Sequence, residues 1–256
     1  MASMRITIVA GADGAPFVHE LADLLGEDDE LTVVVPIIRD QWLTGLKVCP
    51  DLDALLGVDA TPTHAVADGL NAVGYSPAWH RPTDTNITSQ LIRTELLNTG
   101  YSLTEATQAE AKRRRLPFTL LPMSDDRAEL HAVVAEEDGA RAIHISEYLA
   151  APADRELQEV VLVAGPWSVA AETAQQLASA DVVILGPSSR TLVIDPVLRT
   201  PGLLGTLDAE IPVLVVEHTD DAPAELVRVS GLGQPDPGNA RSVPNDVSAV
   251  LEAVRA

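Results

Sequence analysis

Two glycine-containing loops have the residue types and spacing that suit the binding of a phosphate group. The first loop, Gly11-Ala-Asp-Gly14, is followed by Ala15 and separates a predicted strand at Arg5–Ala10 from a predicted helix at Phe17–Leu25. Backbone N–H groups at the beginning of a helix, together with the helix dipole, bind phosphate well. The spacing matches neither the dinucleotide fingerprint nor a P-loop, so an ordinary tight turn is an equally good interpretation of this loop by itself.

The second loop, Gly186-Pro187-Ser188-Ser189, follows a predicted strand at Asp181–Leu185. Its glycine allows the backbone to approach a ligand closely, and its two hydroxyl groups can bind phosphate oxygens. An ordinary strand-to-helix connection is the alternative interpretation. Ligands of open α/β sheets bind beyond the carboxyl ends of the strands, so we expect both loops to lie at one edge of the sheet. The nucleotide phosphates are therefore predicted to contact Gly11, Gly14, Ala15, Gly186, Pro187, Ser188 and Ser189.

Four aspartates, Asp40, Asp51, Asp53 and Asp84, are candidates for a metal site. Carboxylates beside a diphosphate favour Mg²⁺, a hard cation that takes one or two carboxylates and keeps several waters. Asp51 and Asp53 also fit the first turn of a helix, where acidic side chains are favoured without any metal. In a chain this acidic, a structural role is the more frequent one for any single aspartate. The six histidines show no spacing typical of metal ligands.

The charge balance restricts the partners. Thirty-eight acidic residues against 17 basic ones give a formal net charge of −21. Such a charge repels nucleic-acid phosphates and anionic lipid, so it argues against nucleic-acid and membrane partners. Cys49 is the only cysteine, which excludes an internal disulfide and a cysteine-ligated metal site. No apolar run is long enough for a bilayer span or a signal peptide, and we expect a cytoplasmic protein.

The elements that must position these residues alternate between strands and helices. Of the 256 residues, 46% are hydrophobic, and Val, Leu, Ile and Ala dominate, which suits buried parallel strands covered by helices. The last third predicts a βαβαβ series with parallel strands. Its members are strands at Val160–Val163, Asp181–Leu185 and Pro212–Val216, a helix at Ala170–Ser179, a short helix near Leu203, and a terminal helix capped by Asn245. The predicted fold class is α/β, with a doubly wound, largely parallel, Rossmann-like sheet.

The middle of the chain predicts an insertion at about 57–150 within a single domain covering 1–256. Leu130–Ala135 and Ala142–Leu149 flank the turn Glu136–Gly139 and predict a β-hairpin. A capping box of Ser102 and Glu105 predicts the beginning of a helix. The remaining predicted elements are strands at Leu31–Val35 and Phe118–Pro122 and helices at His64–Val73, Ile87–Asn98 and Leu103–Arg115.

Five segments resemble signatures of the 2-phospho-L-lactate transferases and occur in the order found in that family. Together they extend over most of the chain up to about Val216, and five matches in order are far more specific than any one of them. They are Trp42–Asp53 (WLTGLKVCPDLD), Leu91–Leu97 (LIRTELL) with Gly100–Glu105 (GYSLTE), Leu121–Asp126 (LPMSDD), Glu147-Tyr148, and Val183–Ser189 (VILGPSS) with Pro201-Gly202.

The resemblance implies an activity. Such enzymes transfer a phospholactyl group, or its phosphoenolpyruvyl relative, from a guanosine diphospho-lactate-type donor to the deazaflavin Fo in coenzyme F-420 biosynthesis. The Fo hydroxyl attacks the proximal phosphorus and GMP leaves, with Mg²⁺ and without a covalent enzyme intermediate, so positioning and charge neutralisation carry the catalysis. The resemblance therefore implies a Mg²⁺-dependent transferase with small-molecule substrates, acting as a homodimer.

The resemblance also assigns roles to individual residues. Asp40, Asp51 and Asp53 are the expected metal ligands, and Asp40, Asp51 and Asp84 are the expected catalytic residues. The deazaflavin is expected beside Trp42, Asp84 and Arg93, although a core position is the more frequent role for a lone aromatic such as Trp42.

The chain departs from the family pattern at several polar positions. Arg39 and Asn86 each stand where the family has an acid, and Gln90 stands where it has a histidine. We therefore expect transfer to be slower than in a family member with all of these residues. The alternative hypothesis is a non-catalytic relative that binds a nucleotide or deazaflavin and has a regulatory or scaffolding role. A third is an enzyme of the same fold that uses another diphosphate donor.

Overall fold

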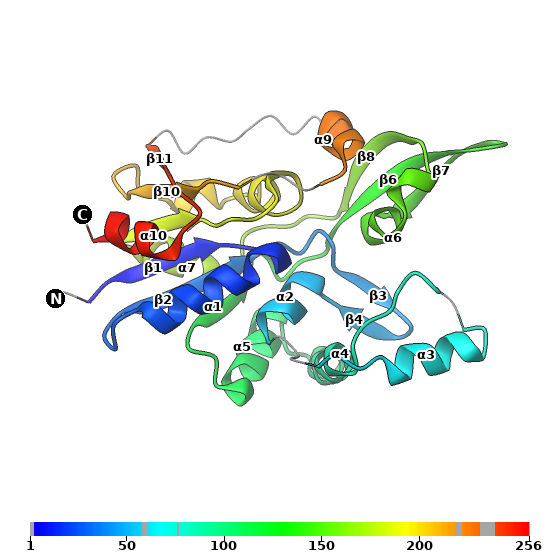
Figure 1. The fold of residues 1–256 in the computed structure, drawn as a ribbon, viewed down its shortest axis with the longest axis horizontal. Helices are drawn as coiled ribbons and strands as arrows, with labels where there is room; N and C mark the ends of the chain where they lie inside the picture. The colour runs from blue at the N-terminus through cyan, green and yellow to red at the C-terminus, as the bar shows by residue number, and fades with distance from the viewer. Residues whose placement is uncertain (1–2, 58–60, 76, 219–221, 231–238, 256) are drawn as a thin grey trace.

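The computed structural model describes residues 3–57, 61–75, 77–218, 222–230 and 239–255, and a six-stranded parallel sheet lies at its centre (Figure 1). The order of the strands is β11-β10-β9-β1-β2-β5. Central β1 places Val9 opposite Leu185 of β9 on one side and Val34 of β2 on the other. The strands are β1 (Arg5–Val9), β2 (Glu30–Val35), β5 (Thr119–Pro122), β9 (Val182–Leu185), β10 (Val213–Val216) and β11 (Ala240–Val243).

Helices flank this sheet and explain why its strands are apolar on both faces. Helices α1 (Ala15–Leu24) and α10 (Val247–Val254) contact each other in front of the sheet in Figure 1, and α7 (Ala171–Ser179) packs on β1 and β5 behind it. Helix α1 buries Val18 and Leu21, which lie three residues apart and so share one helix face. The prediction of a doubly wound, largely parallel α/β fold is confirmed.

A second sheet has three antiparallel strands in the order β7-β6-β8, namely β6 (Ala128–Glu136), β7 (Gly139–His144) and β8 (Leu157–Ala164). The predicted hairpin is confirmed, but its second strand ends at His144. There the His144 Nδ1 accepts a hydrogen bond from the Ser146 N–H and so caps α6 (Ile145–Ala150), which replaces the end of the predicted strand.

The prediction that Val160–Val163 begins a parallel series was wrong. These residues belong to β8, which pairs antiparallel with β6, His131 lying opposite Val161. A short apolar run fits either kind of sheet. The strand lies beside the hairpin because the connection between β7 and β8, through α6 and the turn at Pro152–Asp154, is short.

In its described residues, the segment between β2 and β5 carries a two-stranded hairpin and four helices. The hairpin was not predicted, although its turn residues Thr44 and Gly45 have φ of 53° and 79°, values that Gly adopts at no steric cost. The capping box of Ser102 and Glu105 is confirmed at the beginning of α5. The elements are β3 (Gln41–Leu43), β4 (Leu46–Val48), α2 (Pro50–Leu55), α3 (Ala65–Ala72), α4 (Asp84–Asn98) and α5 (Leu103–Arg114).

The last third differs from prediction in small ways. Asp246, not Asn245, caps α10 by accepting a hydrogen bond from the Ala249 N–H, and β11 was not predicted at all. None of the helices in the described ranges is both long enough and apolar enough to cross a membrane. The remaining helical turns are at Ala12–Gly14, Arg190–Ile194, Asp195–Leu198 (α8), Leu204–Thr206 and Ala224–Ser230 (α9).

Candidate functional site

The two glycine loops meet at the carboxyl edge of the parallel sheet, as predicted. One follows β1 and the other follows β9, and these strands are adjacent and parallel. The Gly11 N–H donates to Ser188 Oγ at 3.1 Å, and the Ser189 N–H donates to Asp13 Oδ2 at 2.6 Å. Two segments that are more than 170 residues apart in the sequence thus form one structural unit.

Two of the glycines are needed for this close approach. A Cβ atom on Gly186 would lie 2.9 Å from the carbonyl oxygen of Val9, and one on Gly14 would lie 2.5 Å from Ser188 Oγ. Real Cβ atoms do not approach other atoms this closely, so a larger residue at either position would separate the loops. The residue types that suggested a phosphate site therefore also have a packing role.

Ala12 of the first loop lines two cavities. The larger has a volume of about 530 Å³ and lies between the loop, α2 and the beginning of α4. The smaller has a volume of about 270 Å³ and lies between the two glycine loops. Residues that line the larger cavity include Ala15, Val48, Pro50, Asp53, His80, Pro82, Thr83, Asn86 and Gln90, and those that line the smaller include Asp13, Arg39, Ser189 and Val193.

The carboxylate of Asp13 occupies backbone donors from both loops. It accepts from its own neighbour Gly14 at 3.0 Å and from Ser189 at 2.6 Å. These N–H groups are among the donors that sequence reasoning assigned to a phosphate. A phosphate that bound these N–H groups would therefore have to displace the Asp13 carboxylate from them. The sequence pattern alone did not reveal this competition.

Asp51 is fully buried and has a cationic partner. Arg39 binds it with two nitrogens, one of them Nε at 3.1 Å from Oδ2, and the Ala12 N–H donates to Oδ1 at 2.9 Å. Burial lowers the pKa of Arg39, but the charge and hydrogen bonds of Asp51 outweigh it and raise this pKa above the ordinary value, so the guanidinium stays charged.

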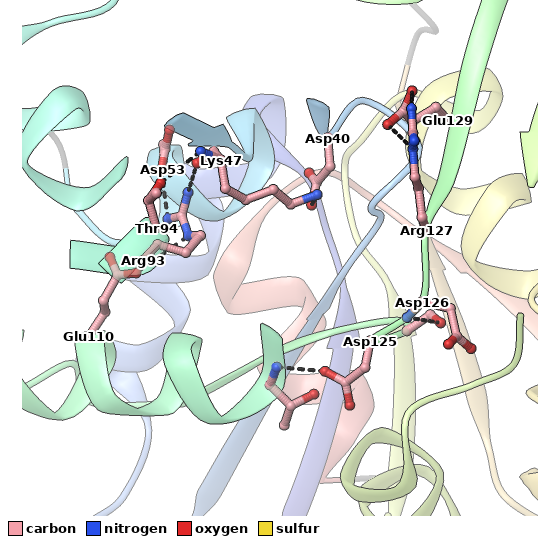
Figure 2. Close-up of polar contacts among 12 residues, drawn as sticks. Asp40, Lys47, Asp53, Arg93, Thr94, Glu110, Asp125, Asp126, Arg127 and Glu129 are labelled. Atoms are coloured by element: carbon pink, nitrogen blue, oxygen red, sulfur yellow. Dashed lines mark hydrogen bonds and ion pairs between the residues drawn. The ribbon is translucent and has the colours of Figure 1, made fainter. Parts of the chain in front are cut away.

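The two other predicted metal ligands are also paired. Lys47 Nζ lies 3.4 Å from Asp40 Oδ2, and Asp53 accepts a hydrogen bond from Arg93 at 2.7 Å (Figure 2). Asp53 also accepts one from Gln90 at 2.9 Å. Burial raises the pKa of Asp40, although Lys47 opposes this shift. Within the described ranges no three His, Cys, Asp or Glu side chains gather as a metal site would require. As arranged, these three aspartates do not fit a divalent cation.

Arg93 also reaches a second acid. Its side chain is wholly buried and lies between Asp53 and Glu110, with Nε 3.4 Å from Glu110 Oε1 (Figure 2). Neither Glu110 carboxylate oxygen has a hydrogen-bond partner among the described residues. Burial raises the pKa of Glu110 to about 7, and the charge of Arg93 limits the rise. This triad ties α2, α4 and α5 together.

The family model "2-phospho-L-lactate transferase CofD" matches residues 6–230. The chain belongs to the CofD family. The "Phosphoenolpyruvate transferase" of Kitasatospora aureofaciens is 34% identical over 98% of this chain and 80% of its own length. Those of Mycolicibacterium smegmatis and Mycobacterium avium are 35% and 33% identical, each over 80% of this chain and 70% and 72% of their own lengths.

Among solved structures, two of a Bacillus halodurans protein, BH3568, resemble this CofD-family chain in fold. One, described as a member of the UPF0052 family, superposes with a TM-score of 0.61 at 14% identity and covers 90% of this chain and 76% of its own. The other gives a TM-score of 0.60 at 16% identity, over 89% of this chain and 76% of its own. At such low identity the likeness concerns the fold alone.

The three residues predicted to bind a deazaflavin do not gather around one cavity in this CofD-family chain. Asp84 begins α4 and accepts hydrogen bonds from Thr63, Ala65 and Val66, which fixes the beginning of α3. Trp42 lies on the β3–β4 hairpin with 51% of its surface exposed, so a core position is ruled out. Arg93 is buried and lines no part of the larger cavity, although it binds Asp53, which does line it. Their role in binding stays a prediction.

Sequence reasoning missed His80 and Arg39 as residues of the site. His80 was interpreted as core or surface, yet it lines the larger cavity, and burial lowers its pKa so that the neutral imidazole is favoured. No spacing signal marks this histidine. Arg39, Asn86 and Gln90 were noticed only as departures from the family pattern, and all three line one of the two cavities.

Proposed function

We propose that this CofD-family chain transfers a phosphoenolpyruvyl or phospholactyl group from a guanosine diphospho-linked donor to the deazaflavin Fo, with release of GMP, in coenzyme F-420 biosynthesis. The family match and the resemblance of the five sequence segments support the reaction class. The relatives' name, phosphoenolpyruvate transferase, favours the phosphoenolpyruvyl donor over the phospholactyl one.

The observation that carries the proposal is the pair of cavities that share Ala12. The smaller cavity, between the two glycine loops, suits the donor's diphosphate, because loop N–H groups and the Arg39 guanidinium surround it. The larger cavity is walled mainly by apolar groups such as Val48, Pro50 and Pro82 and suits a planar ring system. A hydroxyl on the ring's side chain would reach the donor's phosphorus at Ala12.

The transfer needs no nucleophile from the protein. The Fo hydroxyl oxygen forms the new bond to phosphorus, the bond from phosphorus to the GMP oxygen breaks, and the hydroxyl proton is lost to solvent or a nearby base. The protein contributes orientation and fixed charges, which is the usual division of work in phosphoryl transfer. His80, held neutral by burial, has the protonation state of a base at the wall of the acceptor cavity.

The family resemblance implies Mg²⁺ dependence and a homodimer. A divalent cation here would have to displace Arg39, Lys47 or Arg93 from the aspartates that they bind. The same pairing favours the second candidate, a non-catalytic relative that binds a nucleotide or deazaflavin, because an occupied carboxylate cannot assist the reaction without first being released.

A single-turnover reaction with enzyme in excess over Fo tests the proposal. We expect a product with the mass of the phosphoenolpyruvyl or phospholactyl adduct of Fo, and GMP in equal amount. Gly186→Val should abolish product formation, whereas Gly165→Val, whose added Cβ meets nothing within 4 Å, should not. Binding of Fo and GDP without any product from either donor would favour the non-catalytic candidate.

A further inference from the structure

We propose that Arg39 is a resident cation of the active edge, taking the place of a divalent metal ion at Asp51 and facing the donor's diphosphate directly. The part that concerns the donor rests on the proposed function, and the part that concerns the metal does not.

Asp51 has little capacity left for another ligand. An ionised carboxylate offers about four lone-pair sites. Three are used by the two nitrogens of Arg39 and by the N–H of Ala12, and the side chain is fully buried. A metal ion at Asp51 would have to remove a bidentate guanidinium, the strongest kind of partner that a carboxylate finds within a protein.

The charges of the three aspartates are already balanced. Asp40 faces Lys47, Asp51 faces Arg39, and Asp53 faces Arg93, which also lies 3.4 Å from Glu110, so each of the three aspartates has a positive partner. A hard dication normally binds where carboxylates are present in excess of cations. Here the protein itself supplies the positive charge that such an ion would bring.

Arg39 is the cation of the three that a ligand can reach. Its side chain is 18% exposed and lines the smaller cavity, whereas Lys47 is 13% exposed but lines neither cavity, and Arg93 is wholly buried. Among the residues that line the smaller cavity, Arg39 is the basic one, and Ala12, Asp13 and Ser189 of the glycine loops lie around it. A guanidinium has five N–H groups, and the two bonds to Asp51 leave three for a second anion. The pair Asp51–Arg39 therefore aims a fixed positive charge at the expected diphosphate position.

The metal part is tested with Mn²⁺ alone, measured by electron paramagnetic resonance of the free ion on the full chain. The acidic surface of the protein will bind some Mn²⁺ weakly and non-specifically. The readout is therefore the difference in the number of bound ions between each protein and its Asp51→Asn counterpart. We expect the wild-type protein and Asp51→Asn to bind the same number of ions. Arg39→Gln should gain one site, and the further change Asp51→Asn should remove it.

A matched control is available at the other end of the sheet. Arg5 and Asp181 form a similar two-nitrogen pair at the beginnings of β1 and β9, but both are exposed. Arg5→Gln should leave Mn²⁺ binding unchanged. If Arg39→Gln does not fold, the comparison of the wild-type protein with Asp51→Asn still decides: loss of one Mn²⁺ site in Asp51→Asn overturns the proposal.

The donor part is tested by calorimetric titration with GDP in EDTA and in Mg²⁺. We expect the wild-type affinities to agree within about threefold, and Arg39→Gln to lose roughly 10- to 100-fold in EDTA, the range for a hydrogen bond to a charged group. GDP binding that requires Mg²⁺ would overturn the resident-cation proposal and leave the transferase function standing. No GDP binding under either condition would instead refute the nucleotide donor, while the Mn²⁺ result would stand by itself.

Discussion

Glu110→Gln should remove a specific pH dependence of folding stability. In the wild-type protein burial raises the pKa of Glu110 from 4.5 to about 7. A carboxyl group with a raised pKa stabilises the fold fully below its unfolded pKa, and this contribution is lost as the pH rises through the folded value. With these two values, the linkage relation gives a loss of about 2 kcal/mol between pH 5.5 and 8.5. Glutamine cannot ionise and keeps the shape of the side chain.

The measurement is urea denaturation of both proteins at several pH values, with the difference in unfolding free energy as the readout. The difference is needed because His144, whose pKa burial lowers to about 4, has the opposite effect and loses stability as the pH falls below about 6.5. Its contribution is common to both proteins and cancels. Parallel stability curves for the two proteins would refute the assignment of a neutral, buried Glu110 below pH 7.

Three further predictions concern single side chains. Arg93→Met should destabilise the fold by about 3–5 kcal/mol in chemical denaturation, because buried Asp53 loses its countercharge and Glu110 loses its neighbouring cation; a loss below 1 kcal/mol would contradict the triad. Gly186→Val should lower the melting temperature and GDP affinity together, since its Cβ meets the Val9 carbonyl oxygen, and equal values for Gly186→Val and Gly165→Val would argue against the close approach. Trp42→Ala should change stability by less than about 1 kcal/mol, since the ring is half exposed; unaltered quenching of Fo fluorescence in this variant would remove Trp42 from the acceptor site.

The sequence predicted the parallel sheet well because buried parallel strands have a distinctive composition. Apolar runs such as Arg5–Ala10 and Asp181–Leu185, each followed by a glycine-containing loop and a helix, have few other interpretations. It failed at β8 because Val160–Val163 has the same local pattern, and only tertiary pairing with β6 distinguishes the two cases. The hairpin of β3 and β4 was missed because each strand has only three residues.

The position of the candidate site could be predicted, but its electrostatics could not. Strand-loop-helix order places Gly11–Gly14 and Gly186–Ser189 at one edge, which topology alone requires. The pairing of charges could not be predicted in this way. Asp51 binds Arg39, which lies 12 residues away in the sequence, and Asp53 binds Arg93, which lies 40 residues away. No periodicity links such positions, so an acid that will be neutralised cannot be distinguished in the sequence from one that will bind a metal.

The three aspartates are not equivalent, and their differences indicate where the site can respond to a ligand. Asp51 and Asp53 are held by bidentate or multiple hydrogen bonds, so removing their partners would leave a buried charge uncompensated. Asp40 has an ion pair with Lys47 at 3.4 Å, a longer contact than those of Asp51 and Asp53. Burial raises its pKa, so ionised Asp40 is the least stabilised of these charges. Because Asp40 is buried and lines neither cavity, a ligand meets the site at Arg39 and Asp53, while Asp51 and Asp53 keep α2 in place beside the acceptor cavity.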